Sequence, residues 1–137
     1  MAGNISFERR KQRGKMNAYR RMVQLLKHKI SLVVFPEGTR SVTGKLKRFK
    51  KGAFRAAIAT KVPVVPVTIT GTREMMPNHA YVPLRYPPEP IKMNVHPAID
   101  SKGRSDEELS ELAFKAIDSG LPKHLQMESP QEESTVR

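Results

Sequence analysis

The sequence predicts an α/β fold, with a mixed, largely parallel sheet flanked by helices, because strand-like and helix-like segments alternate along the chain. The strand-like segments cover residues 3–9, 30–35, 62–70 and 91–96. The helix-like segments cover residues 15–29, 53–60 and 105–119. Parallel neighbours need a long crossover, usually a helix, so we expect residues 15–29 to connect two parallel strands.

Two of the predicted strands lie in the first third of the chain. Ile5 and Phe7 alternate with polar neighbours, which is typical of a short strand. Residues 30–35 form a largely apolar run of the kind that is buried in a sheet. Pro36 should end that strand, because proline has no N–H to donate to a neighbouring strand.

The segment between these strands has the pattern of an amphipathic helix. Its apolar side chains recur with helical spacing: Met16, Tyr19, Val23 and Leu26. Its basic side chains lie largely off that stripe: Arg20, Arg21, Lys27 and Lys29. We interpret them as the solvated back of a crossover helix. The alternative is a face that rests on an anionic membrane, at about 1 kcal/mol per basic side chain.

The middle of the chain predicts a helix, a strand and a loop. Residues 53–60 are rich in alanine and should pack closely on a sheet. In residues 62–70, Pro63 can begin a strand and Pro66 can lie at an edge or bulge. The proline-rich residues 75–90 predict an irregular surface loop.

The last third predicts a strand, a capped helix and a tail. Apolar residues alternate in residues 91–96, as in a strand. Ser105 and Glu108 form a capping box that opens a helix. Residues 123–137 are polar and are expected to be disordered, so we assign residues 1–122 to the folded domain.

Composition restricts the function. The chain has 137 residues and no cysteine, which indicates one domain without disulfides or thiolate chemistry. It has no apolar run of about 18 residues and no apolar core of a secretory signal near its start. Its net charge is +12, and most Lys and Arg lie in residues 9–61. This half suits an anionic partner, namely nucleic acid, anionic lipid or a phosphorylated substrate.

The stretch after residues 30–35 is the most informative part of the chain. It places Glu37, Gly38, Thr39 and Arg40 in a loop, and further basic residues follow without an acid up to Arg55. Ligands of open α/β sheets bind beyond the carboxyl ends of strands. A cationic loop at that position is suited to hold an anion such as phosphate.

Residues 35–41, Phe-Pro-Glu-Gly-Thr-Arg-Ser, resemble the FPEGTRS block of the glycerophospholipid acyltransferases and match it at every position. Residues 3–9 resemble the family's glycine–arginine block more loosely, and residues 62–66 resemble its proline-containing block. The resemblance covers residues 3–120. It implies a glycerol-3-phosphate acyltransferase-like fold. It also implies an O-acyltransferase of phospholipid biosynthesis that acylates 1-acylglycerol-3-phosphate to phosphatidic acid.

The resemblance also implies which residues bind the substrate phosphate. Arg40, together with Arg9, would neutralise the phosphate of lysophosphatidate. Arg10 is a rival for the role of Arg9, and Arg9 is otherwise the first residue of a solvated basic face.

Four further residues complete the predicted substrate site. The N–H of Gly38 and the hydroxyl of Thr39 would add hydrogen bonds to the phosphate. Glu37, which only accepts hydrogen bonds when ionised, would orient Arg40 or contact a glycerol hydroxyl. Lys51 lies at the start of the next helix, where free N–H groups favour an anion, and its alternative is a solvated side chain.

The family's catalytic pair, H-x-x-x-x-D, is absent. The histidines are His28, His79, His96 and His124, and none has an aspartate five positions later. We therefore assign no catalytic residue. We expect the chain to be the C-terminal part of an acyltransferase domain, truncated at its N-terminus and inactive alone. The resemblance implies no metal or other cofactor, and acyl-CoA or acyl-carrier protein as co-substrate.

A non-catalytic basic protein that binds anionic phospholipid or nucleic acid is the alternative. Nucleic acid is disfavoured, because aromatic residues make up only 6% and there is no tryptophan for stacking. The expected partners are lysophosphatidate, an acyl thioester and an anionic membrane surface, and the expected location is the membrane periphery.

Overall fold

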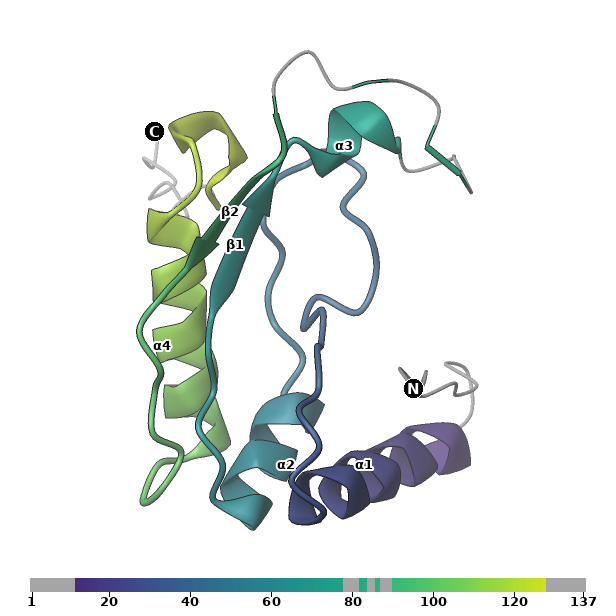
Figure 1. The fold of residues 1–137 in the computed structure, drawn as a ribbon, viewed down its shortest axis with the longest axis vertical. Coiled ribbons are helices and arrows are strands. Elements are labelled where there is room, and N and C mark those ends of the chain that lie inside the picture. The colour runs from purple at the N-terminus through teal and green to yellow at the C-terminus, as the bar shows by residue number, and fades with distance from the viewer. Residues whose placement is uncertain (1–11, 78–81, 84–85, 87–89, 128–137) are drawn as a thin grey trace, which may run out of the picture.

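A computed structural model describes residues 12–77, 82–83, 86 and 90–127 of the chain (Figure 1). Its elements, in order, are α1 (Gln12–Lys27), α2 (Gly52–Thr60), β1 (Val67–Thr70), α3 (Thr72–Met75), β2 (Lys92–Val95), α4 (Asp106–Ser119) and a 3₁₀ turn (Lys123–Leu125). The predicted strand at residues 3–9 lies outside the described residues. No helix among the described residues has the length and apolarity needed to cross a membrane.

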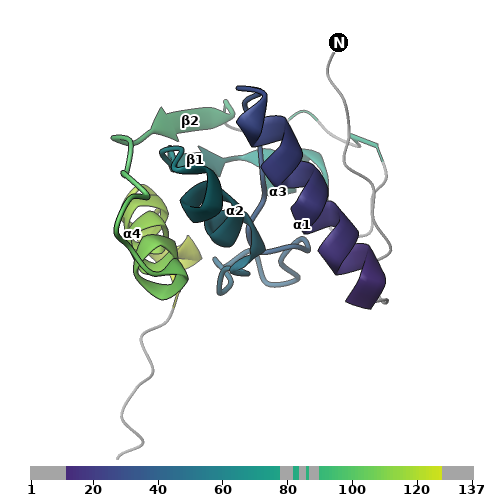
Figure 2. The same cartoon turned by 90° about the horizontal axis from the view of Figure 1, so that it is seen from below.

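Three helices form a layer with α2 at its centre. Figure 2 shows α2 between α1 and α4, with the two strands on one side of them. The core lies between α2 and α4, where Phe54, Ala57, Leu109 and Ala113 are buried together. Leu109 is completely buried. The order of the helices leaves α1 at the outer edge of the layer.

The helix predictions are confirmed, and the backbone explains where the helices end. Lys29 has a φ of 60°, and the N–H of Ile30 donates to Leu25 O at 3.1 Å, which closes the end of α1. Lys61 ends α2 in the same left-handed conformation. The hydroxyl of Ser105 accepts a hydrogen bond from the Glu108 N–H at 3.1 Å, as the capping box predicts.

The sheet differs from the prediction. Among the described residues it consists of β1 and β2, which pair antiparallel with Val67 opposite Val95. Only the last four residues of the predicted strand 62–70 are in the ladder, and Val64 forms a separate bridge to Ile99. Pro66 lies between bridge and ladder. It has no N–H to donate, and its carbonyl accepts from His96 N.

Residues 30–35 are not a strand in the described structure, and the prediction that they are buried is wrong. Val33 is 91% exposed and Phe35 is 73% exposed. A strand requires backbone hydrogen bonds from a neighbour, and no described residue forms a ladder with this segment. Instead, Phe35 O accepts from the Gly38 N–H at 3.1 Å, which turns the chain into the next loop.

The described part of the expected tail, residues 123–127, packs back on the protein. Leu46 N donates to Leu125 O at 3.0 Å. The side-chain amide of Gln126 donates to Asp118 O at 3.1 Å and to Leu121 O at 3.0 Å. These contacts attach the 3₁₀ turn to the end of α4 and to the loop before α2.

Candidate anion-binding loop

Residues 36–50 form a loop whose two ends meet. Lys50 N donates to Pro36 O at 2.8 Å. Gly38 has a φ of +76°, a conformation that side chains rarely adopt. A Cβ at Gly38 would lie 2.7 Å from Lys50 Nζ, so the lysine side chain covers the glycine closely. The ammonium group of Lys50 therefore lies close to the loop backbone at Gly38.

Lys47 holds the next two predicted residues in place. Its backbone N–H donates to Glu37 Oε2 at 3.0 Å, and its ammonium donates to Thr39 Oγ1 at 3.1 Å. Burial raises the pKa of Glu37 above 4.5, and the hydrogen bond and charge of Lys47 oppose this rise only in part. Glu37 thus closes the loop across ten residues, a structural role that its position in the sequence did not reveal.

Arg40 is exposed on the surface of this loop. Its Nη1 donates to Pro77 O at 3.2 Å, which ties the loop to the segment after α3. Its predicted partner in phosphate binding, Arg9, lies outside the described residues. Of the two arginines predicted to bind phosphate, only Arg40 belongs to the described part of the structure.

Lys51 belongs to a different part of the structure. It is the N-cap residue of α2, and its ammonium forms an ion pair with Glu107 of α4. One turn further on, Arg55 Nε donates to Asp106 Oδ2 at 2.7 Å. Lys51 therefore contributes to the contact between two helices, whereas its neighbour Lys50 lies over the loop.

Sequence reasoning did not single out Arg73, which also touches the loop. Its Nη2 donates to Val42 O at 2.9 Å, and its guanidinium occupies the space above Gly44 that a side chain would need. Gly44 has a φ of +87°, so both its conformation and this close approach favour glycine. The sequence does contain a signal for this contact: a basic residue, Arg73, follows shortly after the end of β1 at Thr70.

The loop thus joins four cations with one half-buried carboxylate: Arg40, Lys47, Lys50 and Arg73 with Glu37. Guanidinium and ammonium groups gathered on one loop are suited to bind phosphate, because charge-assisted hydrogen bonds are the strong ones.

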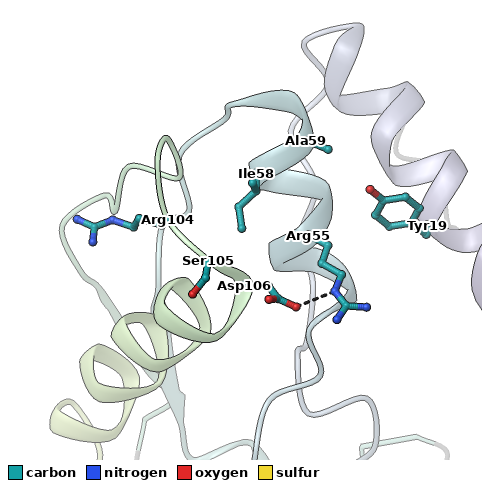
Figure 3. A pocket seen from close by; sticks show the side chains of 7 residues that line it. All are labelled: Tyr19, Arg55, Ile58, Ala59, Arg104, Ser105 and Asp106. Atoms are coloured by element: carbon teal, nitrogen blue, oxygen red, sulfur yellow. Dashed lines mark hydrogen bonds and ion pairs between the residues drawn. The ribbon is translucent and has the colours of Figure 1, made fainter.

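Two cavities lie elsewhere. The first, of about 360 Å³, lies between the three helices and is shown in Figure 3. It is lined by Tyr19, Arg55, Ile58, Ala59, Arg104, Ser105 and Asp106. Its arginines are already neutralised, since Arg55 pairs with Asp106 and Arg104 pairs with Glu108. The second, of about 610 Å³, is lined by Ile58, Lys61, Ser101, Lys102 and Gly103. None of the predicted binding residues that the structure describes lines either cavity.

The described residues contain no cluster of three or more His, Cys, Asp or Glu side chains arranged to hold a metal ion.

Helices packed on a small two-stranded sheet, with a cationic loop before α2, place the described part of the chain in the α/β class. The sequence profile of the Acyltransferase family matches residues 1–70, half of the chain. The chain therefore belongs to the acyltransferase family.

Several enzymes with assigned activities are similar in sequence to more than half of this chain. A 1-acyl-sn-glycerol-3-phosphate acyltransferase of Chlamydomonas reinhardtii is 34% identical over 91% of this chain and 37% of its own length. The chloroplastic BAT2 enzyme of Brassica napus, which has the same activity name, is 46% identical over 56% of this chain and 22% of its own. The human alpha form is 27% identical over 88% of this chain and 42% of its own. The chain thus spans less than half the length of each.

A solved structure supports the fold. The 1-acyl-sn-glycerophosphate acyltransferase PlsC of Thermotoga maritima superimposes with a TM-score of 0.68 and 36% sequence identity. The match covers 75% of this chain and 42% of that chain. The chain therefore has part of the PlsC acyltransferase fold.

Proposed function

We propose that this chain is the phosphate-binding part of an acyltransferase of phospholipid biosynthesis. The complete enzyme would transfer an acyl chain from acyl-CoA or acyl-carrier protein to 1-acylglycerol-3-phosphate and form phosphatidic acid. Family membership and the activity names of the relatives support this function over a nucleic-acid-binding role.

The observation that carries the proposal is the loop of residues 36–50. Its hydrogen-bonded ends, the Lys50 side chain over Gly38 and the Lys47 contacts to Glu37 and Thr39 fix a cationic surface around Arg40. Arg40 itself donates to Pro77 O, which holds its guanidinium at this surface. Arg9 would supply the second arginine.

The chemistry divides between this loop and a base from outside these residues. The acceptor hydroxyl attacks the thioester carbonyl carbon, a C–O bond forms and the C–S bond breaks. A base takes the hydroxyl proton, and the leaving thiolate receives a proton. In this proposal the H-x-x-x-x-D pair is supplied by a part of the protein outside the 137 residues, because no such spacing occurs in them. The Arg40 loop positions the acceptor through its phosphate.

The same proposal includes the sheet, the domain boundary, the co-substrate and the location of the complete enzyme. In the complete fold we expect residues 30–35 to join a mixed, largely parallel sheet, since their apolar side chains are exposed here. We keep the domain boundary near residue 122, although residues 123–127 contact α4. The acyl thioester serves as co-substrate without a metal, and the enzyme works at the periphery of a membrane.

The test is lysophosphatidate turnover by the complete enzyme with Arg40→Ala. Loss of one arginine–phosphate contact costs about 2 kcal/mol or more, so we expect kcat/KM to fall by about 30-fold or more. The loss should be much smaller with monoacylglycerol, which has no phosphate for Arg40 to bind. This difference separates phosphate recognition from general damage to the enzyme.

Arg48→Ala is the matched control, because Arg48 is an exposed arginine of the same loop. We expect it to leave kcat/KM within about twofold, as exposed substitutions usually have small effects. Unchanged lysophosphatidate turnover with Arg40→Ala, or equal losses with both acceptors, would refute the assignment of Arg40.

A further inference from the structure

The outer face of α1 carries a straight row of basic side chains. Arg13, Arg20 and Lys27 are seven residues apart, which is about two helical turns, so they lie on one stripe of the helix. All three side chains are exposed. At a rise of 1.5 Å per residue, the row is about 21 Å long. We call Arg13, Arg20 and Lys27 the α1 stripe.

No acidic side chain neutralises the α1 stripe within the described part of the chain. Residues 9–36 contain no Asp or Glu. Within the described part of the chain, no carboxylate forms an ion pair with the α1 stripe. Arg21, beside the stripe, donates to the side-chain carbonyl of Gln24 at 2.9 Å and finds no acid there either. The charge of this face is therefore not neutralised from within the described fold.

The stripe also faces away from α2, the helix on which α1 packs. Ala18, on the opposite side of α1, is only 7% exposed and marks the inner face. Figure 2 shows α2 on one side of α1, and no helix of the described residues lies on the opposite side of α1. Met16, at the edge of the stripe, is 52% exposed, and Ile30 just after the helix is 48% exposed. A row of cations with apolar neighbours can meet charged headgroups and the acyl boundary beneath them.

We propose that the α1 stripe is the surface by which this chain docks on an anionic membrane. The proposal deepens the proposed function, on which it rests, since the substrates of that reaction are membrane lipids. Charge complementarity identifies the occupant: a plane of anionic headgroups faces a straight cationic row, at about 1 kcal/mol per basic side chain.

A membrane fits this face better than nucleic acid does. Protein faces that bind single strands combine cations with aromatic stacking surfaces, and the α1 stripe has none. The one aromatic residue of α1, Tyr19, lines the cavity between the helices. A continuous face of basic and exposed apolar side chains is typical of helices that lie on lipid.

The test is co-sedimentation of the 137-residue chain with vesicles of equal parts phosphatidylcholine and phosphatidylserine. Phosphatidylserine is used because it is neither substrate nor product of the proposed reaction. We expect binding to these vesicles and none to pure phosphatidylcholine. The triple variant Arg13→Gln, Arg20→Gln, Lys27→Gln should bind about 100-fold more weakly, at about fivefold per charge removed.

The matched control removes three exposed lysines away from α1: Lys61→Gln, Lys102→Gln and Lys123→Gln. It has the same net charge as the stripe variant, so we expect it to lose less than about tenfold. Equal losses in both triples would show attraction by net charge alone and would overturn the proposal. Undiminished binding of the stripe variant would overturn it as well.

Two further measurements distinguish membrane binding by the α1 stripe from binding by the phosphate site and from binding of nucleic acid. Arg40→Ala should weaken binding to phosphatidylserine vesicles by no more than about fivefold, the effect of one charge, while it abolishes most lysophosphatidate turnover, so failure of the proposed phosphate site and failure of the membrane surface give different results. If a DNA or RNA oligonucleotide binds more tightly than the vesicles at equal salt and loses affinity in the stripe variant, the partner is nucleic acid and the lipid assignment is wrong.

Discussion

The contact between α2 and α4 and the outer face of α1 use basic residues in opposite ways. At the contact, Lys51 pairs with Glu107 and Arg55 pairs with Asp106. On α1, Arg13, Arg20 and Lys27 have no acidic partner among the described residues. The net charge of +12 does not distinguish the two groups. Cations that are paired across helices belong to the fold, whereas a row that the fold leaves unpaired is available to a partner.

The same contrast separates two neighbouring lysines, Lys50 and Lys51. Lys51 was predicted to bind substrate because it precedes a helix N-terminus, but its ammonium is engaged with Glu107. Lys50, one residue earlier, lies over Gly38 in the loop. Two lysines that are adjacent in the sequence thus contact different parts of the structure, and the prediction that Lys51 binds substrate stays a prediction.

The largest effect on stability should come from the centre of the helix contact. Leu109 is completely buried between α2 and α4, so Leu109→Ala leaves a cavity. We expect it to lower the free energy of unfolding by about 2–5 kcal/mol, measured by urea unfolding. Met16→Ala on α1 is the control, and because Met16 is 52% exposed we expect a change of less than about 1 kcal/mol. Similar losses at both positions would mean that α1 is packed as tightly as α4.

The second effect is a pH dependence of the helix contact. Hydrogen bonds with Glu107 and from Arg55 lower the pKa of Asp106 from 3.8 to about 2. A lowered pKa in the folded state means that the ionised carboxylate stabilises the fold. This contribution is complete above the unfolded pKa and is lost as the pH falls from about 4 to about 2.

Asp106→Asn removes the titrating group, so its unfolding free energy should fall less steeply than that of the unmodified chain over this pH range. Urea unfolding at a series of acidic pH values measures the two slopes. Glu74→Gln is a suitable control, because Glu74 is exposed on α3 and forms no ion pair among the described residues. Identical slopes for Asp106→Asn and the unmodified chain would show that Asp106 does not contribute to the contact.

Local patterns predicted the helices well. The capping box at Ser105 and the apolar spacing of residues 15–29 depend on neighbours within a few residues, and both helices form where they were expected. The antiparallel partner of β1 and the exposure of residues 30–35 depend on which strand lies beside each segment. Periodicity shows that a run is apolar, but the identity of its neighbour is set by the whole fold.

The candidate site was predictable in its residue types and less so in its contacts. The cationic loop followed from the run around Arg40, whereas the Lys47–Glu37 bond spans ten residues and the Lys51–Glu107 pair spans 56. Arg73 reaches Val42 over 31 residues. Such contacts are fixed by the packing of distant segments, and no spacing rule in the sequence specifies them.

The smallest expected effect is the change in unfolding free energy when the charges of the α1 stripe are removed. If Arg13, Arg20 and Lys27 are available to a partner, the triple Gln variant should unfold within about 0.5 kcal/mol of the unmodified chain, because exposed substitutions without partners change stability little. Urea unfolding at low salt is the appropriate measurement, since salt would screen a weak charge interaction. A loss above about 1 kcal/mol would mean that these side chains stabilise the fold, and the weaker vesicle binding of the variant would then no longer identify a docking surface. Unchanged stability together with lost vesicle binding would separate the two uses of positive charge in one molecule.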